Sequence, residues 1–226
     1  MELEFRNKTK EKTVKVSKAI ISISTLDKSI IENFIEDYDV VVVDNKDTFF
    51  ASTTVLNEIS NFSVYPLINL VTDVMQILEL DHDFFDRKVS TLSTTEKIYL
   101  NILRNISKSD EIILFKDIFL GLDLNNQKKL VKALNYLKNI GYIILICSSD
   151  VDYLYNIAEY SLIATKTFIE FGKTDDIYTD VETLVKHRLE VPTLSYITYK
   201  AKKEKNIKLF YSKDVRDIIK DIYKHV

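Results

Sequence analysis

Short apolar runs alternate with amphipathic segments along most of this chain. Three runs contain no charged residue, namely Val40–Val43, Ile112–Phe115 and Tyr142–Cys147. Runs of this length predict strands of a parallel sheet that helices cover on both faces. Segments with helical spacing lie between the later runs, such as Asn125–Ile140, which Gly141 is placed to end. This alternation of strands and helices predicts an α/β fold.

The two ends of the chain have different patterns. Apolar and polar residues alternate over Met1–Ser24, which predicts short strands. From Thr179 onward the chain is polar and helical in pattern, with Pro192 at an expected helix start. We therefore divide the chain into a larger domain, 1–178, and a helical C-terminal extension, 179–226. Within the larger domain we also expect a helix around Ile30, Ile31, Phe34 and Ile35, a helix from Ser52 through Ile59, a helix over Leu67–Leu80, and two edge strands, Tyr160–Ala164 and Thr167–Phe171.

The segment Ser93-Thr94-Thr95-Glu96 has the pattern of a capping box in front of an amphipathic helix. In this motif the serine hydroxyl accepts from the backbone N–H three residues on, and the glutamate accepts from the serine N–H. Because capping boxes are common, a plain helix cap is the simpler interpretation of this motif taken alone.

Composition excludes several classes of function. The 226 residues carry a net charge of −3 with both signs interspersed, which gives no footprint for nucleic acid. The single cysteine, Cys147, allows no disulfide within the chain and favours a reducing, cytoplasmic setting. The histidines His82, His187 and His225 lie apart in polar contexts, which predicts no metal site.

Glycine is scarce, and this excludes the common phosphate-binding loops. Only Gly121, Gly141 and Gly172 occur. A loop that wraps phosphates with backbone N–H groups needs glycines, because the chain must adopt positive φ angles and approach the ligand closely. Neither G-x-x-x-x-G-K-[ST] nor G-x-G-x-x-G is present.

Three segments in order resemble the motifs of the ATP-binding cassette (ABC) ATPases. Leu92–Lys97 resembles the signature that opens a helix in this family. The residues of this vestigial signature are Ser93, Thr94, Thr95 and Glu96. Lys116 and Asp117 follow the strand Ile112–Phe115, at the place of the two acidic Walker B residues. Gly121-Leu122-Asp123 resembles the D-loop. As a plain turn, the same segment would make Asp123 the N-cap of the next helix.

The segment between the first apolar strand and the next helix resembles a degenerate Walker A loop. Lys46–Thr54 occupies the place of the loop, and the positions that match it are Lys46, Ser52, Thr53 and Thr54. Ser52 stands where the family has its lysine, and Thr53-Thr54 resembles the Ser/Thr pair. The two threonines are equally suited to begin a helix. Ser149, after the strand Tyr142–Cys147, stands in place of the switch histidine.

The tail is similar to the C-terminal extension of energy-coupling-factor transporter ATPases, through His187–Thr193 and the helices expected after it. Only Val55–Val89 separates the loop from the signature, which is too short for a full helical subdomain. The resemblance implies an ABC-ATPase-like, P-loop NTPase-type mixed sheet flanked by helices, with a reduced helical subdomain and a helical C-terminal extension.

The residues at the family's catalytic positions do not suit phosphoryl transfer, which depends on positioning and on neutralising charge. Lys116 reverses the charge at the metal side, Asp117 is shorter than the usual glutamate, and Ser149 and Ser52 replace a histidine and a lysine. We expect no catalytic residue, no metal site, no cofactor bound by the chain alone and no ATP hydrolysis by the chain alone. ATP and magnesium are expected only at an interface shared with a competent partner.

The resemblance implies a degenerate subunit of an ABC transporter of the energy-coupling-factor type. Its partners would be an intact ABC ATPase subunit, as a heterodimer, and a transmembrane coupling subunit that holds it at the inner face of the cell membrane. A regulatory or scaffold protein without nucleotide is the alternative from another class, and an active ATPase with unusual motifs is a third.

Overall fold

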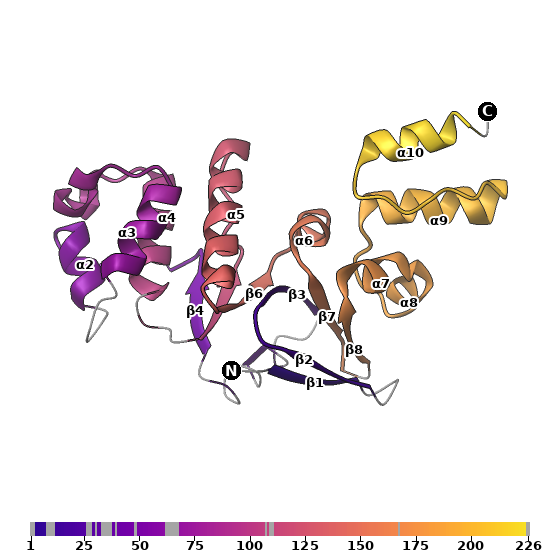
Figure 1. The fold of residues 1–226 in the computed structure, drawn as a ribbon, viewed down its shortest axis with the longest axis horizontal. Helices are drawn as coiled ribbons and strands as arrows, with labels where there is room; N and C mark the ends of the chain where they lie inside the picture. Colours follow the sequence, from indigo (N-terminus) through magenta and orange to yellow (C-terminus); the bar gives the residue numbers. More distant parts are fainter. Residues whose placement is uncertain are drawn as a thin grey trace. The chain divides into compact units, whose positions relative to one another are not determined.

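The computed structural model describes residues 3–7, 12–25, 29, 31–32, 38, 40–47, 49–61, 68–106, 108, 111–166 and 168–224 (Figure 1). The helix expected around Ile30 falls outside these residues, apart from Ile31, and so do Thr167 and His225.

Six strands form a mixed sheet in the order β4-β5-β6-β3-β7-β8. Their bounds are Ala19–Thr25 for β3, Val40–Asp44 for β4, Ile112–Lys116 for β5, Ile143–Cys147 for β6, Tyr160–Ala164 for β7 and Ile169–Lys173 for β8. Strand β4 pairs parallel with β5, β5 with β6 and β3 with β7, whereas β8 is antiparallel to β7. The expected mixed α/β sheet is therefore confirmed. The prediction of two edge strands is wrong for β7, because β3 pairs along its other side.

Contacts between residues divide the chain into two compact units. The first comprises Met1–Glu2, Ser17–Ile20 and Asn33–Cys147, and the second comprises Leu3–Val16, Ile21–Glu32 and Ser148–Val226. The second unit groups the C-terminal helices with β7 and β8. The division of the chain at residue 178 stays a prediction.

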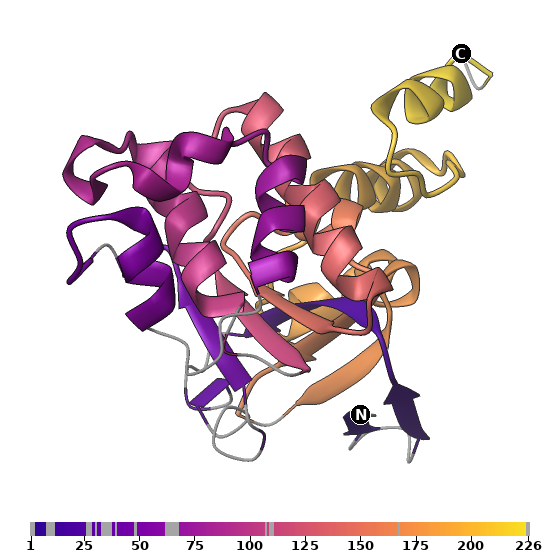
Figure 2. The ribbon, with the colours of Figure 1, turned by 60° about the vertical axis from the view of Figure 1, so that its left-hand side comes forward.

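Among its described residues, the first unit contains β4, β5 and β6 with four α-helices and two short 3₁₀ helices. These are α2 (Val55–Asn61), α3 (Ile68–Ile77), η1 (His82–Asp86), η2 (Val89–Thr91), α4 (Thr94–Ile106) and α5 (Leu124–Asn139). Figure 2 draws the ribbon from a second direction. Helix α4 packs against β4, and α5 packs against β6. Strands β5 and β6 are buried over Ile112–Phe115 and Ile143–Ile146, as their continuous apolar runs predict.

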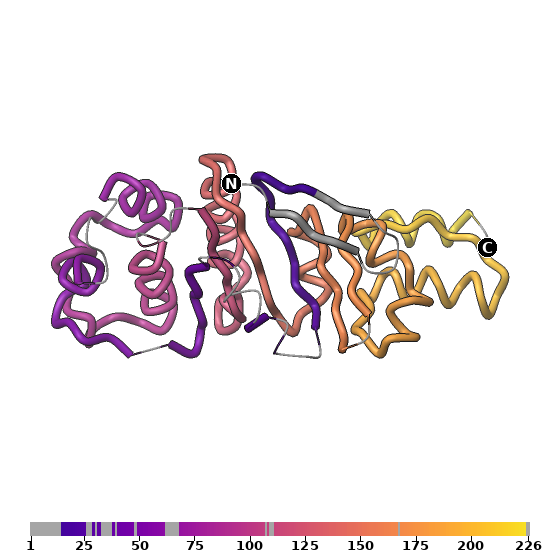
Figure 3. Tube along the Cα trace, turned by 90° about the horizontal axis from the view of Figure 1, so that it is seen from below, coloured from indigo at the N-terminus to yellow at the C-terminus, as the bar shows by residue number. Residues whose placement is uncertain are grey.

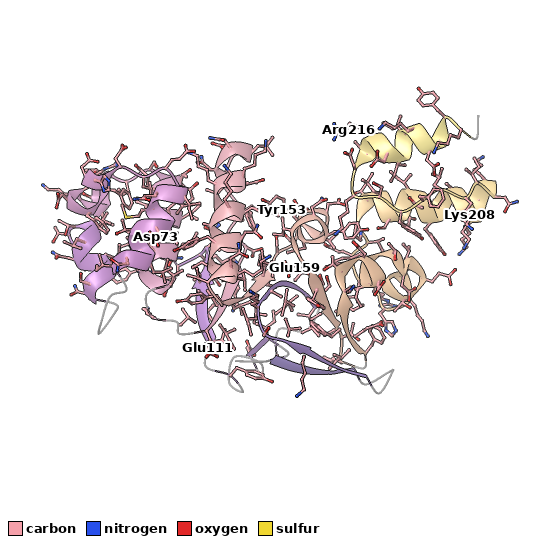
Figure 4. The ribbon with its side chains drawn as sticks, in the orientation of Figure 1. Asp73, Glu111, Tyr153, Glu159, Lys208 and Arg216 are labelled. Atoms are coloured by element: carbon pink, nitrogen blue, oxygen red, sulfur yellow. The ribbon has the colours of Figure 1, made fainter. Side chains whose placement is uncertain are left out.

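Helices α3 and α5 of this unit are linked at their surface. The Tyr136 hydroxyl on α5 donates to Asp73 on α3 at 2.5 Å, and Asp73 is labelled in Figure 4. Gly141 follows α5 with a φ of +119°, a conformation that favours glycine after a helix end. The helix end expected at this glycine is confirmed.

The second unit contains the antiparallel pair β1 (Leu3–Asn7) and β2 (Lys12–Val16), strands β7 and β8, and the helices from α6 to α10. The helices are α6 (Val151–Ile157), α7 (Thr174–Thr179), α8 (Val181–Lys186), α9 (Thr193–Lys205) and α10 (Val215–Ile222). Helix α9 begins directly after Pro192, as expected, and α10 packs beside it (Figure 3). Among the described residues, no helix combines the length and the apolarity that crossing a membrane requires.

Candidate functional site

The carboxyl ends of three parallel strands meet in the first unit. The register pairs Asp44 at the end of β4 with Lys116 at the end of β5, and Lys116 with Cys147 at the end of β6. In open α/β sheets, ligands bind outside the carboxyl ends of the strands. At this edge the middle strand ends in a lysine, where binding of a divalent cation calls for a carboxylate. Among the described residues there is no cluster of His, Cys, Asp and Glu side chains that could hold a metal ion.

The chain turns sharply after Lys116. Asp117 has a φ of 52°, in the left-handed region, and its N–H donates to the carbonyl of Cys147 at 2.9 Å. Gly121 follows with a φ of +85°, which favours glycine. The Asn45 side chain donates to the carbonyl of Leu120 at 3.0 Å. The turn after β5 is thus tied to the segment after β4, which is the position expected for a Walker A loop.

Protein acceptors bind the described backbone N–H groups that begin this loop. The N–H of Lys46 donates to the Asp44 carboxylate at 2.9 Å, and the N–H of Asp47 donates to the Asp44 carbonyl at 3.0 Å. The N–H of Asn45 donates to the carbonyl of Lys116 at 3.0 Å. A phosphate-binding loop instead directs several of its N–H groups to the ligand. The segment therefore has the location of a Walker A loop and a different set of hydrogen bonds.

Arg104 of α4 holds this segment from the protein interior. Arg104 is 1% exposed, and its Nη1 donates to the Glu58 carboxylate at 2.7 Å and to the Phe49 carbonyl at 2.8 Å. Its Nη2 donates to the Asp47 carboxylate at 2.7 Å. The guanidinium carbon lies 4.7 Å from the centre of the Phe50 ring. Hydrogen bonds of this number and geometry are what a buried guanidinium needs to offset the loss of its water.

Glu58 of α2 completes the network. Glu58 is 0% exposed. One of its carboxylate oxygens accepts from Arg104, and the other accepts from the N–H of Ser52 at 2.8 Å. Ser52 is the residue that the sequence resemblance places at the family's lysine position. The positive charge beside the loop therefore comes from Arg104 of α4, and the Glu58 carboxylate already binds it.

Two asparagines of α4 add to this network. Asn101 donates to the carbonyl of Asp44 at 2.8 Å and accepts from Nε of Arg104 at 3.2 Å. The amide of Asn105 donates to Asn101 at 2.8 Å and 3.0 Å. The sequence motifs did not indicate Arg104, Glu58 and Asn101 as residues that anchor the loop. A signal was present, because Asn101, Arg104 and Asn105 have helical i, i+3, i+4 spacing within a segment that is otherwise apolar.

The threonine pair after the loop serves as a helix start. The Thr54 hydroxyl accepts from the N–H of Asn57 at 3.4 Å, and α2 begins at Val55. Thr54 also forms an antiparallel bridge with Lys88, and the carbonyl of Thr53 accepts from Val89 at 3.0 Å. The contacts of Thr53 and Thr54 are those of residues at a helix start, which is the simpler of the two interpretations of this pair.

The expected capping box forms at the start of α4. The N–H of Ser93 donates to Glu96 at 2.8 Å, and the N–H of Glu96 donates to the Ser93 hydroxyl at 3.3 Å. Arg87 also pairs with the Glu96 carboxylate. Burial raises the pKa of Glu96, but the hydrogen bonds from Arg87 and Ser93 outweigh it and leave the pKa below its ordinary value. Thr94 is exposed and Thr95 is half-buried.

Asp123 is the N-cap of α5. Its carboxylate accepts from the N–H and from the side-chain amide of Asn126, each at 2.8 Å, and the backbone bond is the main cause of its lowered pKa. The Tyr99 hydroxyl donates to the Asn126 side chain at 3.0 Å, which joins the signature helix α4 to the D-loop position. Burial, together with the charge of Asp123, raises the pKa of Tyr99 to about 12.

The structure brings most of the predicted site residues into one unit. Those in the first unit are Lys46, Ser52, Thr53, Thr54, Ser93, Thr94, Thr95, Glu96, Lys116, Asp117 and Asp123. Ser149 is in the second unit, exposed, directly before the α6 N-cap Asp150.

Comparisons with known proteins agree with this architecture. No protein-family model matches the chain. The manganese transport system ATP-binding protein MntA of Synechocystis sp. is 26% identical over 94 residues, which are 42% of this chain and 36% of that protein. A second curated relative, from Pyrococcus furiosus and named for an ABC transporter ATP-binding protein, is 24% identical over 111 residues, which are 49% of this chain and 41% of the relative. The aligned part thus spans less than half the length of these relatives.

Solved structures match over most of the chain. One is cbiO1 from Clostridium perfringens, described as part of the ABC transporter complex cbiONQ; the match covers 88% of this chain and 96% of cbiO1, with a TM-score of 0.61 and 13% identity. Another is the ADP conformation of MJ1267, an ATP-binding cassette of an ABC transporter, with 78% and 91% covered, a TM-score of 0.58 and 16% identity. The ABC ATPase fold that the sequence motifs predict is therefore confirmed.

Proposed function

We propose that this chain, which has the ABC ATPase fold, is a catalytically degenerate subunit of an ABC transporter of the energy-coupling-factor type. It pairs with a competent ATPase subunit, and a transmembrane coupling subunit holds the pair at the inner face of the membrane. The likeness to cbiO1, a part of cbiONQ, supports this assignment over most of the chain. The similarity of His187–Thr193 to the energy-coupling-factor extension supports it further.

One observation supports the loss of catalysis most directly. Carboxylates and carbonyls of the chain itself bind the N–H groups of Asn45, Lys46, Asp47 and Ser52, so these groups do not converge on a phosphate. Beside them Lys116 puts a positive charge where a metal-bound phosphate needs a carboxylate. Phosphoryl transfer is mainly positioning and charge neutralisation, so the loss of both removes the basis for turnover.

The signature and D-loop positions keep the local structure that the family resemblance implies, and these are the segments that would contact a nucleotide bound by a partner subunit. In the family, the signature of one subunit completes the nucleotide site of the other. Here Ser93–Glu96 still opens a helix of 13 residues, and Asp123 still begins α5. A helix start offers a positive dipole to an anion. The capping box binds the N–H groups of Ser93 and Glu96, so the residues that would face the anion are Thr94 and Thr95 between them. ATP and magnesium are thus bound mainly by the partner, with this chain closing one side.

The experiment combines binding by the chain alone with assembly. The purified chain is titrated with Mg-ATP by calorimetry, and we expect no saturable heat. The chain is then co-expressed with an ABC ATPase and a membrane protein encoded beside it, and we expect the three to co-purify. Ser93→Arg should weaken ATP-dependent pairing through bulk at the helix start, whereas Ser212→Arg in the second unit serves as the control. Saturable Mg-ATP binding by the chain alone contradicts the proposal, as does failure to co-purify with either neighbour.

A further inference from the structure

The Glu58 carboxylate has the surroundings of a bound anion. One oxygen accepts from the Arg104 guanidinium at 2.7 Å, and the other accepts from the N–H of Ser52 at 2.8 Å. Anion sites in proteins combine a fixed cation with backbone N–H donors in the same way. Glu58 is completely buried and Arg104 almost so, and both interactions are therefore shielded from water.

The same carboxylate closes the loop on itself. Ser52 and Phe49 lie within the segment that resembles a Walker A loop, and Arg104 binds the Phe49 carbonyl as well as Glu58. A loop that binds phosphate is ordered by its ligand, which links its N–H groups to a cation. Here Glu58, which belongs to the helix following the loop, makes that link without a ligand.

We propose that the Glu58 carboxylate is an internal substitute for a bound oxyanion, and that it locks the loop between Asp44 and Glu58 in a ligand-independent form. Removing this carboxylate uncovers an anion site at Arg104 and the Ser52 N–H, and the site takes a phosphate-type oxyanion. The inference rests on the proposed function and deepens it, because it gives a reason why the described residues of the loop bind groups of the chain itself.

The groups around the pair explain both the lock and the ligand class. Asp47 accepts from Nη2 of Arg104, and its side chain is 53% exposed, so it faces water while Glu58 does not. Lys108 lies close enough for the charge of Arg104 to contribute to its lowered pKa, after the larger effect of burial. With Glu58 present, the carboxylates of Glu58 and Asp47 both bind Arg104, and their combined negative charge disfavours an incoming anion. Without Glu58, one N–H of Arg104 Nη1 and the N–H of Ser52 lose their acceptor, and together they suit an oxyanion that accepts two hydrogen bonds, while Asp47 keeps Nη2.

The test measures binding of inorganic phosphate to the full chain. The wild type, Glu58→Ala and Glu58→Ala/Arg104→Met are compared by thermal unfolding and calorimetry in phosphate and in chloride of equal ionic strength. We expect the wild type to gain only the general stabilisation that phosphate gives by its exclusion from protein surfaces. Glu58→Ala should melt lower in chloride and gain about 2–6 °C more than the wild type with phosphate at about ten times its Kd. The double variant should gain no more than the wild type, because it lacks the cation.

Several results overturn the proposal. One is a Glu58→Ala chain that phosphate stabilises no more than the wild type, and another is an equal response with and without Arg104. If Glu58→Ala is unfolded in chloride, folding in phosphate supports the proposal, and a chain unfolded in both salts overturns it. Wild-type binding of Mg-ATP would contradict the proposed function but would leave the phosphate response of Glu58→Ala to be judged by itself.

Discussion

Nη1 of Arg104 lies 2.7 Å from Oε1 of Glu58, and the two side chains, which come from helices α4 and α2, are 2% and 0% exposed. A buried ion pair gains from the low local dielectric only when its remaining hydrogen-bonding groups are satisfied. Here Ser52, Asp47, Phe49 and Asn101 satisfy them. The pair therefore fixes the loop position to α4, as a ligand does in a nucleotide-binding protein.

Removing one member of the pair should cost far more stability than removing both. Arg104→Met or Glu58→Leu alone leaves a buried charge without its partner, and we expect each to lower the free energy of unfolding by about 3–5 kcal/mol. The double variant should lose much less than the sum, because no unpaired charge remains. Urea denaturation of the four proteins gives the coupling energy.

An exposed ion pair provides the control for this cycle. Lys200 and Glu204 pair across one turn of α9 and are 41% and 55% exposed. The same cycle there should give a coupling of about 0.3–0.5 kcal/mol. Additive losses at Arg104 and Glu58 would show that the two residues act separately, and that the loop does not depend on their pairing.

The capping box at the start of α4 should make a measurable, pH-dependent contribution. Ser93→Ala removes the side-chain acceptor and should lower the free energy of unfolding by about 0.5–2 kcal/mol. The pKa of Glu96 is lowered in the folded chain. Its contribution is therefore present at neutral pH and above its ordinary pKa, and is lost as the pH falls through the lowered value. Denaturant titrations of wild type and Glu96→Gln at neutral and acidic pH test the sign: the difference between them should shrink in acid.

Local patterns predicted much of the fold. The strands β5 and β6 follow from continuous apolar runs, and the cap at Ser93 and the end of α5 at Gly141 follow from residues within one helical turn. These features depend on short-range sequence and are encoded where they occur. The N-cap role of Asp123 was likewise predictable, as the plain alternative to a D-loop.

Long-range pairing is what the sequence did not reveal. Glu58 and Arg104 lie 46 residues apart. The polar stripe of Asn101, Arg104 and Asn105 marks one face of a helix, but it does not show whether that face meets water or a distant partner. The burial of Glu58 and Arg104 depends on how α2 packs against α4 and α4 against β4, which no local pattern specifies. The degenerate loop was therefore predictable as a loss of glycines and lysine, but the network that replaces the ligand was not.

The Cys147 thiol lies at the carboxyl end of β6, and its alkylation rate is sensitive to the charges near this edge of the sheet. Burial raises its pKa, and the charge of Asp117 adds to this effect. We expect alkylation by iodoacetamide to be slower in the folded chain than in denaturant at pH 8, because less thiolate is present. Asp117→Asn removes a nearby negative charge and should speed alkylation of the folded chain by about two- to fivefold below the pKa. Glu79→Gln, whose carboxylate pairs with Lys129, is the matched control and should leave the rate unchanged. An Asp117→Asn chain that reacts at the wild-type rate would contradict the assigned charge coupling.

Restoring single family residues should not restore ATP hydrolysis. Lys116→Asp returns a carboxylate at the metal side, but the register then places it beside Asp44, and the loop N–H groups still bind protein acceptors. Ser52→Lys returns a positive charge, but its N–H remains bound to Glu58 and Phe49 and Phe50 remain in the loop. Residues that act as a unit in catalysis have strongly non-additive effects, so one restored residue has no partner to act with.

The measurement is phosphate release by each purified variant without its partner. A preparation of Ser52→Ala, made in the same way, controls for contaminating ATPases. We expect all three proteins to release phosphate at the same background rate. Turnover by Lys116→Asp alone would mean that the loop already holds a triphosphate and that only the metal ligand was missing. The hydrogen bonds of Asn45, Lys46, Asp47 and Ser52 would then have to open in solution, and the chain would be an enzyme silenced at one residue.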